Sequence, residues 1–325
     1  MIASGTFGWD GYGRALVGQD LRGQIVHPVS QGRQLPLVEP SEESGRIDFE
    51  RLGAVVAKTV TMKPREGNPE PRWHPQSWRR AQEAGEDIYL NSIGLTNPGI
   101  HNILTEHAPY WARWDVPVIL SLAGETVQEF GDMASMADET PGIVGLELNL
   151  SCPNVDNGAV FSHSSELAAE TVQRVKESTS FPVIAKLSPN VPDIVPIARA
   201  VEGAGADAIT LVNTVPAMAI NMDTRRPILG GITGGISGPA LKPVALALVY
   251  KASQAVNVPV IGVGGVFKAD DALAFLYAGA TAVQVGSANL ADFWAPLAVL
   301  DGLYAYVGEH GIGHISELVG SAWPA

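Results

Sequence analysis

The stretch "VPVIGVGGVFKADDALAFLYAGATAVQVGS" (258–287) decides the fold class. It opens with a short apolar, β-branched run, passes through two glycines into a helix-like segment, and ends in a second apolar run. Continuous apolar runs of this kind are typical of strands buried on both faces of a parallel sheet. A strand, a helix and a second strand in this order predict a βαβ unit.

The same pattern recurs along the chain. Apolar runs that end in polar or glycine residues occur at 1–5, 53–61, 116–122, 145–151, 181–188, 207–214, 258–265 and 282–287. Helix-like segments lie between the later runs, at 164–179, 191–205, 240–256 and 269–280. Eight strands alternating with helices predict an α/β fold of the (β/α)8 TIM-barrel type.

We expect one domain over residues 1–325, with surface insertions near 23–45 and 76–88. The segment 23–45 is rich in polar residues and proline, which is typical of a surface excursion with a small β-element at most. A doubly wound open sheet is the rival fold. It usually carries a glycine-rich loop after its first strand, and "GTFGWDGYG" (5–13) matches that loop poorly.

Composition limits the classes of function. The chain is 46% hydrophobic and 17% charged, so a large core is expected and global disorder is not. A net charge of −13 argues against a general nucleic-acid or anionic-membrane binder. The single cysteine excludes an intramolecular disulfide, which fits the cytoplasm, and the sequence shows neither a signal peptide nor a membrane span.

Reactive and ligand-type residues collect where the apolar runs end, which is where TIM barrels place their active sites. They are Ser4, Gly5, Lys58, Thr59, Asn149, Cys152, Lys186, Asn213, Thr214, Gly264, Gly265, Gly286 and Ser287. A lysine inside a barrel mouth is costly to bury unless an anion or a polar ligand meets it. The alternative is that each lysine reaches out to the rim, but two lysines together with two strand-end asparagines argue against it.

The last two runs end in small residues with free backbone N–H groups, in "GVGGV" (262–266) and "VGSANL" (285–290). Adjacent strands seven and eight form the usual phosphate-binding position of this barrel. Each glycine pair could also serve only to turn the chain into the next helix. Together, on neighbouring strands, the two pairs predict a phosphate-bearing ligand.

Several long motifs resemble class 1 dihydroorotate dehydrogenases, and the NAD-linked two-subunit form, class 1B, most closely. The resemblance extends from residue 3 to at least Asp292. Its motifs are "ASGTFG" (3–8), "EGNPEPR" (66–72), "LNSIGLTNPG" (90–99), "LELNLSCPNV" (146–155), "AKLSPNVPDI" (185–194), "LVNTVPAMAINMDTRRPILGGITGGISGPALKPVAL" (211–246) and "VIGVGGVFKADDALAFLYAGATAVQVGSANL" (260–290).

The resemblance implies oxidation of dihydroorotate to orotate by bound FMN, a step of pyrimidine synthesis. Cys152 matches the base that removes a proton from the ring carbon beside the one that loses hydride. A thiol on a loop can reach one face of a planar ring, and nearby polar groups can lower its pKa. The alternative for a lone cysteine is a small buried apolar residue.

The resemblance also implies roles for other residues. Lys58 matches the lysine between flavin and substrate, and Lys186 the one that places positive charge near the flavin's pyrimidine edge. The substrate contacts implied are the side chains of Asn91, Asn149, Asn154 and Asn213, whose amides offer donor and acceptor together. Gly94 and Leu95 would add backbone contacts, and Thr214 a hydroxyl. Further flavin contacts implied are Ala3, Ser4, Gly5, Thr59, Asn149, Ser237 and Gly238, with Gly264, Gly265, Gly286 and Ser287 around the phosphate.

Three functional hypotheses remain open on the sequence. The first is a catalytic subunit that works with NAD through an electron-transfer subunit carrying FAD and a 2Fe-2S cluster, as a heterotetramer on a homodimer core. One cysteine cannot hold such a cluster in this chain. The second is a stand-alone fumarate-dependent enzyme, or a relative resembling dihydropyrimidine dehydrogenases. The third is a truncated, non-catalytic barrel.

Overall fold

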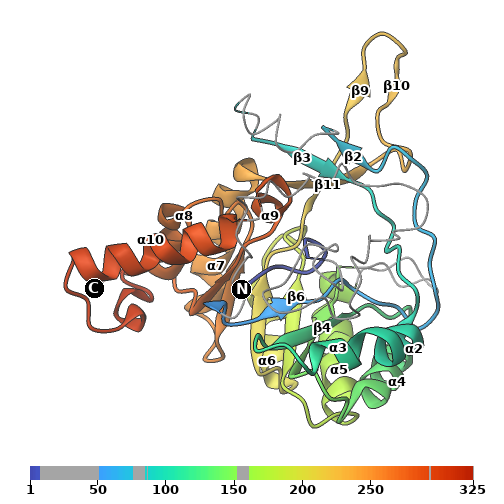
Figure 1. The fold of residues 1–325 in the computed structure, drawn as a ribbon, viewed down its shortest axis with the longest axis horizontal. Coiled ribbons are helices and arrows are strands. Elements are labelled where there is room, and N and C mark those ends of the chain that lie inside the picture. The colour runs from blue at the N-terminus through green and yellow to red at the C-terminus, as the bar shows by residue number, and fades with distance from the viewer. Residues whose placement is uncertain (8–50, 76–84, 86, 152–160, 293, 325) are drawn as a thin grey trace.

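The computed structural model describes residues 1–7, 51–75, 85, 87–151, 161–292 and 294–324. Their central element is a curled parallel sheet of order β1-β4-β5-β6-β7-β12-β13 (Figure 1). Its strands are β1 (Val55–Val56), β4 (Val118–Leu122), β5 (Gly145–Asn149), β6 (Val183–Leu187), β7 (Ala208–Leu211), β12 (Val260–Val263) and β13 (Ala282–Gln284). Each neighbouring pair is parallel, as the apolar runs predict.

The N-terminal residues close this sheet into a barrel. Ile2 forms parallel bridges both to Val55 of β1 and to Val285 beyond β13. The backbone N–H of Ile2 donates to Ala54 O at 3.2 Å, and that of Ala3 donates to Val285 O at 3.0 Å. The parallel sheet has seven strands, and the run at 1–5 occupies the position of the eighth, between β1 and β13. It forms only isolated bridges there and is too short to count as a strand. The prediction of a (β/α)8 barrel is confirmed.

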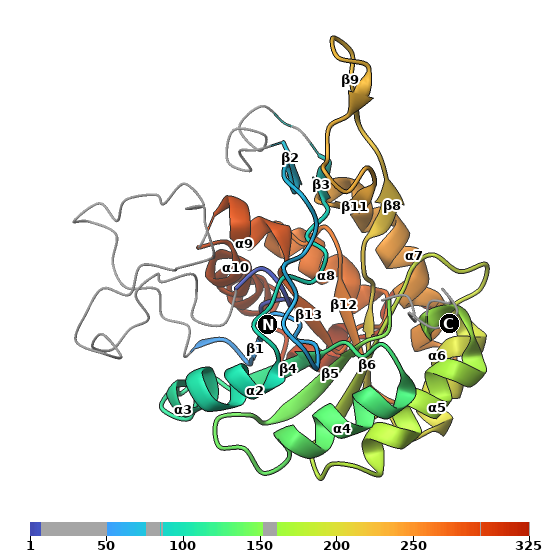
Figure 2. The same cartoon turned by 90° about the vertical axis from the view of Figure 1, so that its right-hand side faces the viewer.

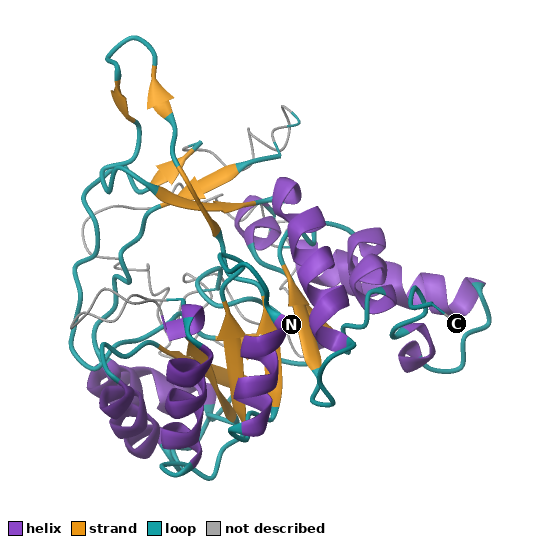
Figure 3. Cartoon of the chain, turned by 180° about the vertical axis from the view of Figure 1, so that it is seen from behind, coloured by secondary structure: helices purple, strands orange, loops and turns teal. Residues whose placement is uncertain are grey.

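Helices cover the outside of the barrel (Figures 2 and 3). The longer ones are α4 (Val127–Ala137), α5 (Ser165–Lys176), α6 (Val195–Gly203), α7 (Lys242–Ser253), α8 (Ala269–Tyr277) and α10 (Ala295–Glu309). The shorter ones are α2 (Ile100–Asn102), η3 (Ile103–His107), α3 (Ala108–Trp111), η4 (Phe161–His163), η5 (Pro239–Leu241), α9 (Ser287–Ala291) and η6 (Ile315–Leu318). The four segments predicted to be helical contain α5, α6, α7 and α8.

Local chemistry explains where helices begin. The hydroxyl of Ser164 accepts a hydrogen bond from Leu167 N at 3.1 Å, which satisfies one of the free N–H groups at the start of α5. The hydroxyl of Thr126 does the same for α4 by accepting from Glu129 N. These caps fix where each chain segment leaves the barrel mouth and turns into its helix.

Alternation along the strands separates two apolar layers. In β6, Val183, Ala185 and Leu187 belong to the large core between sheet and helices, whereas Ile184 belongs to a smaller cluster inside the barrel. Ile119, Ala208 and Ile261 pack in that same inner cluster. Because side chains alternate between the two faces of a strand, Lys186 shares the inner face with Ile184 and lies one step nearer the strand's carboxyl end.

A second, antiparallel sheet lies over the carboxyl ends of the barrel strands (Figure 1). Its order is β2-β3-β11-β8, with β2 (Trp73–His74), β3 (Tyr89–Asn91), β11 (Gly234–Ser237) and β8 (Val215–Ala217). A separate hairpin, β9 (Ile220–Asn221) and β10 (Arg226–Pro227), projects beyond it. The sequence did not predict these elements, because strands of two to four residues carry no readable alternation.

The proposed surface insertions fall largely outside the described residues. The segment 23–45 lies wholly outside them, and only residues 85, 87 and 88 of the segment 76–88 lie within them. Across the part of the chain that the structure describes, no helix has both the length and the apolar character to cross a membrane.

Candidate active site

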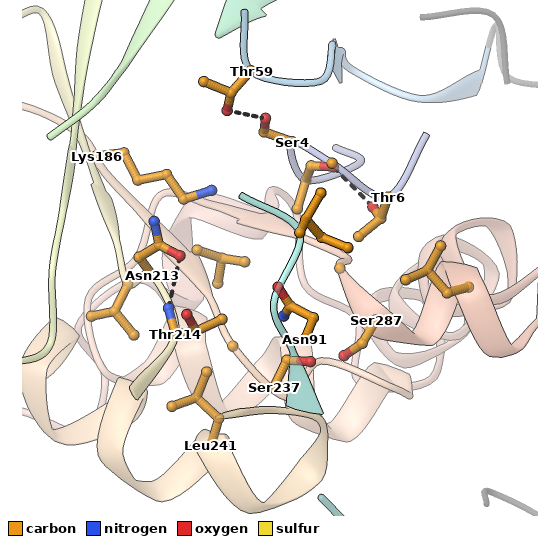
Figure 4. Close-up of a pocket in the computed structure, with 18 of the residues that line it drawn as sticks. Ser4, Thr6, Thr59, Asn91, Lys186, Asn213, Thr214, Ser237, Leu241 and Ser287 are labelled. Carbon is orange, nitrogen blue, oxygen red and sulfur yellow. Dashed lines mark hydrogen bonds between the residues drawn. The ribbon is translucent and has the colours of Figure 1, made fainter. Parts of the chain in front are cut away.

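One cavity opens at the carboxyl ends of the barrel strands, beneath the antiparallel sheet (Figure 4). Residues from both sheets and from the closing N-terminal segment line it. They are Ala3, Ser4, Gly5, Thr6, Lys58, Thr59, Trp73, Asn91, Ile93, Leu95, Lys186, Val212, Asn213, Thr214, Ser237, Leu241, Val263, Gly264, Gly265, Val266, Gly286, Ser287 and Leu290.

A chain of hydroxyl groups lines one wall. Ser4 Oγ donates to Ala57 O at 3.0 Å and lies 3.2 Å from Thr59 Oγ1. Thr59 Oγ1 lies 2.8 Å from Ser121 Oγ, in the buried interior of the barrel. Each hydroxyl has a partner that fixes its rotamer, so this wall presents oriented donors and acceptors rather than mobile ones.

Amide side chains join the ends of β5, β6 and β7 beside the cavity, and Asn213 is the one of them that lines it. Asn213 Nδ2 donates to Asn149 Oδ1 at 3.1 Å, and the backbone N–H of Thr214 donates to Asn213 Oδ1 at 2.8 Å. Asn190 Nδ2 donates to Thr214 O at 3.2 Å and to Ser188 Oγ at 2.9 Å. The strand ends are therefore tied together by side chains, which holds Asn213 and Thr214 in place at the cavity.

Two lysines bring positive charge to the cavity. Lys186 is 7% exposed, and its side chain points into the cavity in Figure 4, with its Nζ 3.5 Å from Glu147 Oε2. Burial of Lys58, together with the nearby positive charge of Arg72, lowers the pKa of that lysine to about 8. A lysine with this pKa is poised to meet an anion, because a negative ligand would restore the protonated form.

Glycines shape the part of the cavity at β12. Gly264 and Gly265 have φ of 125° and 77°, a region that L side chains rarely adopt. A Cβ on Gly265 would lie 2.8 Å from Lys242 Cβ and 3.0 Å from Gly238 O. The chain can therefore turn against α7 here only without a side chain. This leaves backbone exposed to the cavity, as an anion site requires.

Most of the residues predicted for the site meet at this cavity. Those in its lining are Ala3, Ser4, Gly5, Lys58, Thr59, Asn91, Leu95, Lys186, Asn213, Thr214, Ser237, Gly264, Gly265, Gly286 and Ser287. Asn149, Gly94 and Gly238 are not in the lining, although Asn149 contacts Asn213 and Gly238 lies beside Gly265. Cys152 and Asn154 lie outside the described residues.

Sequence reasoning missed several lining residues. They are Thr6, Trp73, Ile93, Val212, Leu241, Val263, Val266 and Leu290. Thr6 and Val266 are next to predicted residues and could have been included with them. Trp73 could not, because it reaches the cavity only through the pairing of β2 with β3.

The fold and the cavity define a class: a (β/α)8-barrel protein whose mouth holds a cavity lined by two lysines, two asparagines and glycine-rich turns. The chain belongs to the dihydroorotate dehydrogenase family, whose model matches residues 38–307. The resemblance seen in the motifs is thus confirmed.

Three similar proteins carry the name "Dihydroorotate dehydrogenase B (NAD(+)), catalytic subunit". The chain is 48% identical to that of Desulforamulus reducens, over 86% of this chain and 90% of the relative. It is 50% identical to that of Desulforudis audaxviator, over 85% and 87%. It is 47% identical to that of Geotalea daltonii, over 86% and 89%.

Proposed function

We propose that this chain is the catalytic subunit of an NAD-linked dihydroorotate dehydrogenase. It oxidises dihydroorotate to orotate with FMN as hydride acceptor, in pyrimidine synthesis. The observation that carries the proposal is the barrel-mouth cavity, which gathers fifteen of the residues predicted for this reaction in a chain of that family.

The residues present fit FMN. Gly264 and Gly265, with Gly286 and Ser287 just after the neighbouring strand β13, would hold its phosphate, since side chains are excluded from the turn at Gly265. The buried ammonium of Lys186 would lie near the pyrimidine edge of the flavin, where negative charge develops on reduction. When bound, FMN would supply the acceptor for the hydride, which carries the two electrons of the oxidation. Other flavin contacts would come from Ala3, Ser4, Gly5, Thr59, Asn149, Ser237 and Gly238.

The substrate is a cyclic ureide with a carboxylate, and its ring becomes planar on oxidation. Asn91 and Asn213 line the cavity and offer amide donors and acceptors to such a ring. Lys58 supplies a positive charge for the carboxylate, and Thr214 a hydroxyl. Asn149, Asn154, Gly94 and Leu95 would complete the substrate contacts.

Cys152 would act as the base. Its thiolate takes the proton from the ring carbon next to the one that loses hydride, so a carbon–carbon double bond forms between the two carbons. The residue comes three positions after Asn149, at the end of β5, whose carboxyl end faces the cavity. Asn154 follows it two positions later in the sequence.

Electrons would leave the chain through a partner. The relatives' name includes NAD(+), which favours NAD as final acceptor over fumarate. An electron-transfer subunit bearing FAD and a 2Fe-2S cluster would link the two, because the single cysteine of this chain cannot hold a cluster. We place the assembly, a heterotetramer on a homodimer core, in the cytoplasm.

The test is the reductive half-reaction. The FMN-loaded chain is mixed with dihydroorotate under anaerobic conditions, and loss of flavin absorbance is followed by stopped flow. We expect rapid bleaching with dihydroorotate and little with dihydrouracil, which lacks the carboxylate that Lys58 would bind. Bleaching by dihydrouracil alone would support a dihydropyrimidine dehydrogenase instead. FMN that stays oxidised with both would support a non-catalytic barrel.

A further inference from the structure

A buried carboxylate inside the barrel takes no part in the steps proposed above. Glu147, on β5, is 0% exposed, and its side chain shares the inner face of the strand with Asn149. A carboxylate in such a site is costly unless it is paired and hydrogen-bonded. The hydrogen-bond and ion-pair partners of Glu147 therefore indicate its role.

Three strands supply those groups. Thr210 Oγ1, on β7, and Gln284 Nε2, on β13, each donate to Glu147 Oε1 at 2.9 Å. Lys186 Nζ, on β6, lies 3.5 Å from the other oxygen, Oε2. One oxygen is thus held by two neutral donors, and the second faces the ammonium.

This cluster forms a polar layer between the barrel's apolar floor and its mouth. Ile184 and Ala208, two residues before Lys186 and Thr210 on the same strands, belong to the inner apolar cluster. Lys186 alone of the four polar residues is in the cavity lining. The polar layer therefore contacts the cavity only through the Lys186 side chain, and Glu147 lies deeper in the barrel than Lys186.

We propose that Glu147 is a positioning residue that acts on the cofactor through Lys186. The inference rests on the proposed function, in which Lys186 lies near the flavin. Thr210 and Gln284 fix the carboxylate, and the carboxylate fixes the position of the Lys186 ammonium. The alternative is an ion pair that only stabilises the barrel.

The ammonium favours reduced, anionic FMN over oxidised FMN, so the ratio of the two dissociation constants reports its effect. This ratio follows from the midpoint potential of bound FMN, measured by titration against a reference dye, and needs no substrate. Replacement of Lys186 by Met removes the charge and should lower the preference for reduced FMN. A carboxylate that acts through Lys186 should matter only while Lys186 is present.

The experiment is a double-mutant cycle with Glu147→Gln, Lys186→Met and the double variant. Glutamine keeps the shape and can still accept from Thr210, but it cannot balance an ammonium. We expect E147Q to lower the preference for reduced FMN by about threefold or more when Lys186 is present, and by less than about twofold when Met replaces it. Lowering is expected because, without the carboxylate that holds it, the ammonium is no longer kept beside the flavin.

A matched control removes another buried carboxylate that pairs with a lysine. Asp271 is 4% exposed, pairs with Lys242, and accepts from the backbone N–H groups of Phe267 and Lys268. Neither Asp271 nor Lys242 is in the cavity lining. Asp271→Asn should lower stability while leaving the preference for reduced FMN unchanged.

The outcomes separate the two proposals. An equal effect of E147Q in both backgrounds, or a rise in the preference for reduced FMN, would overturn the positioning role and leave the proposed function standing. Failure of the unaltered chain to bind FMN would overturn both. If E147Q does not fold, Thr210→Val decides, because it keeps the charge and loosens the carboxylate. Its effect should be smaller, in the same direction, and absent beside K186M.

Discussion

Cys152 lies just beyond β5, three residues after Asn149, in the segment that would face the substrate. At the scale of the single residue, a general base is worth roughly 10²–10⁴-fold in rate. We expect Cys152→Ala to retain bound FMN and to lose that factor in flavin reduction by dihydroorotate. Cys152→Ser should keep some activity only at high pH, because a hydroxyl is a far weaker acid. Flavin reduction at the unaltered rate in the alanine variant would show that another group is the base.

Lys58 makes ligand binding depend on pH. Burial, with Arg72 nearby, lowers its pKa to about 8, so without a ligand the Lys58 side chain is cationic below that pH and neutral above it. A carboxylate favours the cationic form. The affinity for orotate should therefore be constant below about pH 8 and fall by up to about tenfold per pH unit above it.

The measurement is the dissociation constant of orotate, read from the change in the flavin spectrum between about pH 6.5 and about pH 9.5. Lys58→Met is the matched control and should bind orotate weakly with no fall that begins near pH 8. An affinity that stays level up to the alkaline limit in the unaltered chain would contradict a role for Lys58 in binding the carboxylate.

At the scale of the element, the turn after β12 combines backbone strain with close packing. Gly265 has φ of 77°, and a Cβ there would meet both Lys242 and Gly238. Gly265→Ala should lower the free energy of unfolding by about 1–3 kcal/mol and weaken FMN binding, because the turn must shift away from α7. Urea denaturation and FMN titration measure the two effects.

Gly308, in α10, is the control for that substitution. A Cβ on it would meet nothing within 4 Å, and its helix is otherwise regular. Gly308→Ala should raise the free energy of unfolding by about 0.5–1 kcal/mol and leave FMN binding unchanged. Equal effects of the two substitutions would mean that the turn at Gly265 tolerates a side chain.

At the scale of the whole molecule, closure of the barrel depends on a few N-terminal residues. Ile2 is fully buried and bridges β1 and the chain beyond β13. Ile2→Ala should lower the free energy of unfolding by about 2–5 kcal/mol, because it leaves a cavity at the seam, the place where Ile2 joins β1 to the chain beyond β13. Ile220 in the projecting hairpin is 54% exposed, and Ile220→Ala should change stability by less than about 0.5 kcal/mol. A similar small loss for both would show that the seam is not needed for closure.

In the proposed assembly, the electron-transfer subunit would determine the electron acceptor. The purified chain should be reduced by dihydroorotate yet pass electrons poorly to NAD, with dyes or oxygen accepting them instead. Addition of an electron-transfer subunit should restore NAD reduction, measured as steady-state formation of NADH. Turnover with NAD at one rate, with or without that subunit, would favour a stand-alone enzyme.

The sequence by itself determined the barrel and the ends of its strands. Apolar runs such as those around Val183 and Val260 are readable because burial on both faces of a parallel sheet demands apolar residues at successive positions. The same rule places Lys58, Lys186 and Asn213 at one mouth, since parallel strands all end on the same side. Even the short run around Ile2 was readable, although it makes only isolated bridges.

Only the tertiary structure decided what covers the mouth and what lies beneath it. Tyr89 pairs with Ser237 across a long separation in the chain, and strands this short carry no pattern from which the pairing could be predicted. Nor does the sequence show that Glu147, Thr210 and Gln284 meet behind Lys186. The physical reason is that local patterns report how each residue is buried, whereas the partner of a buried polar group is fixed by barrel closure, which brings distant strands together.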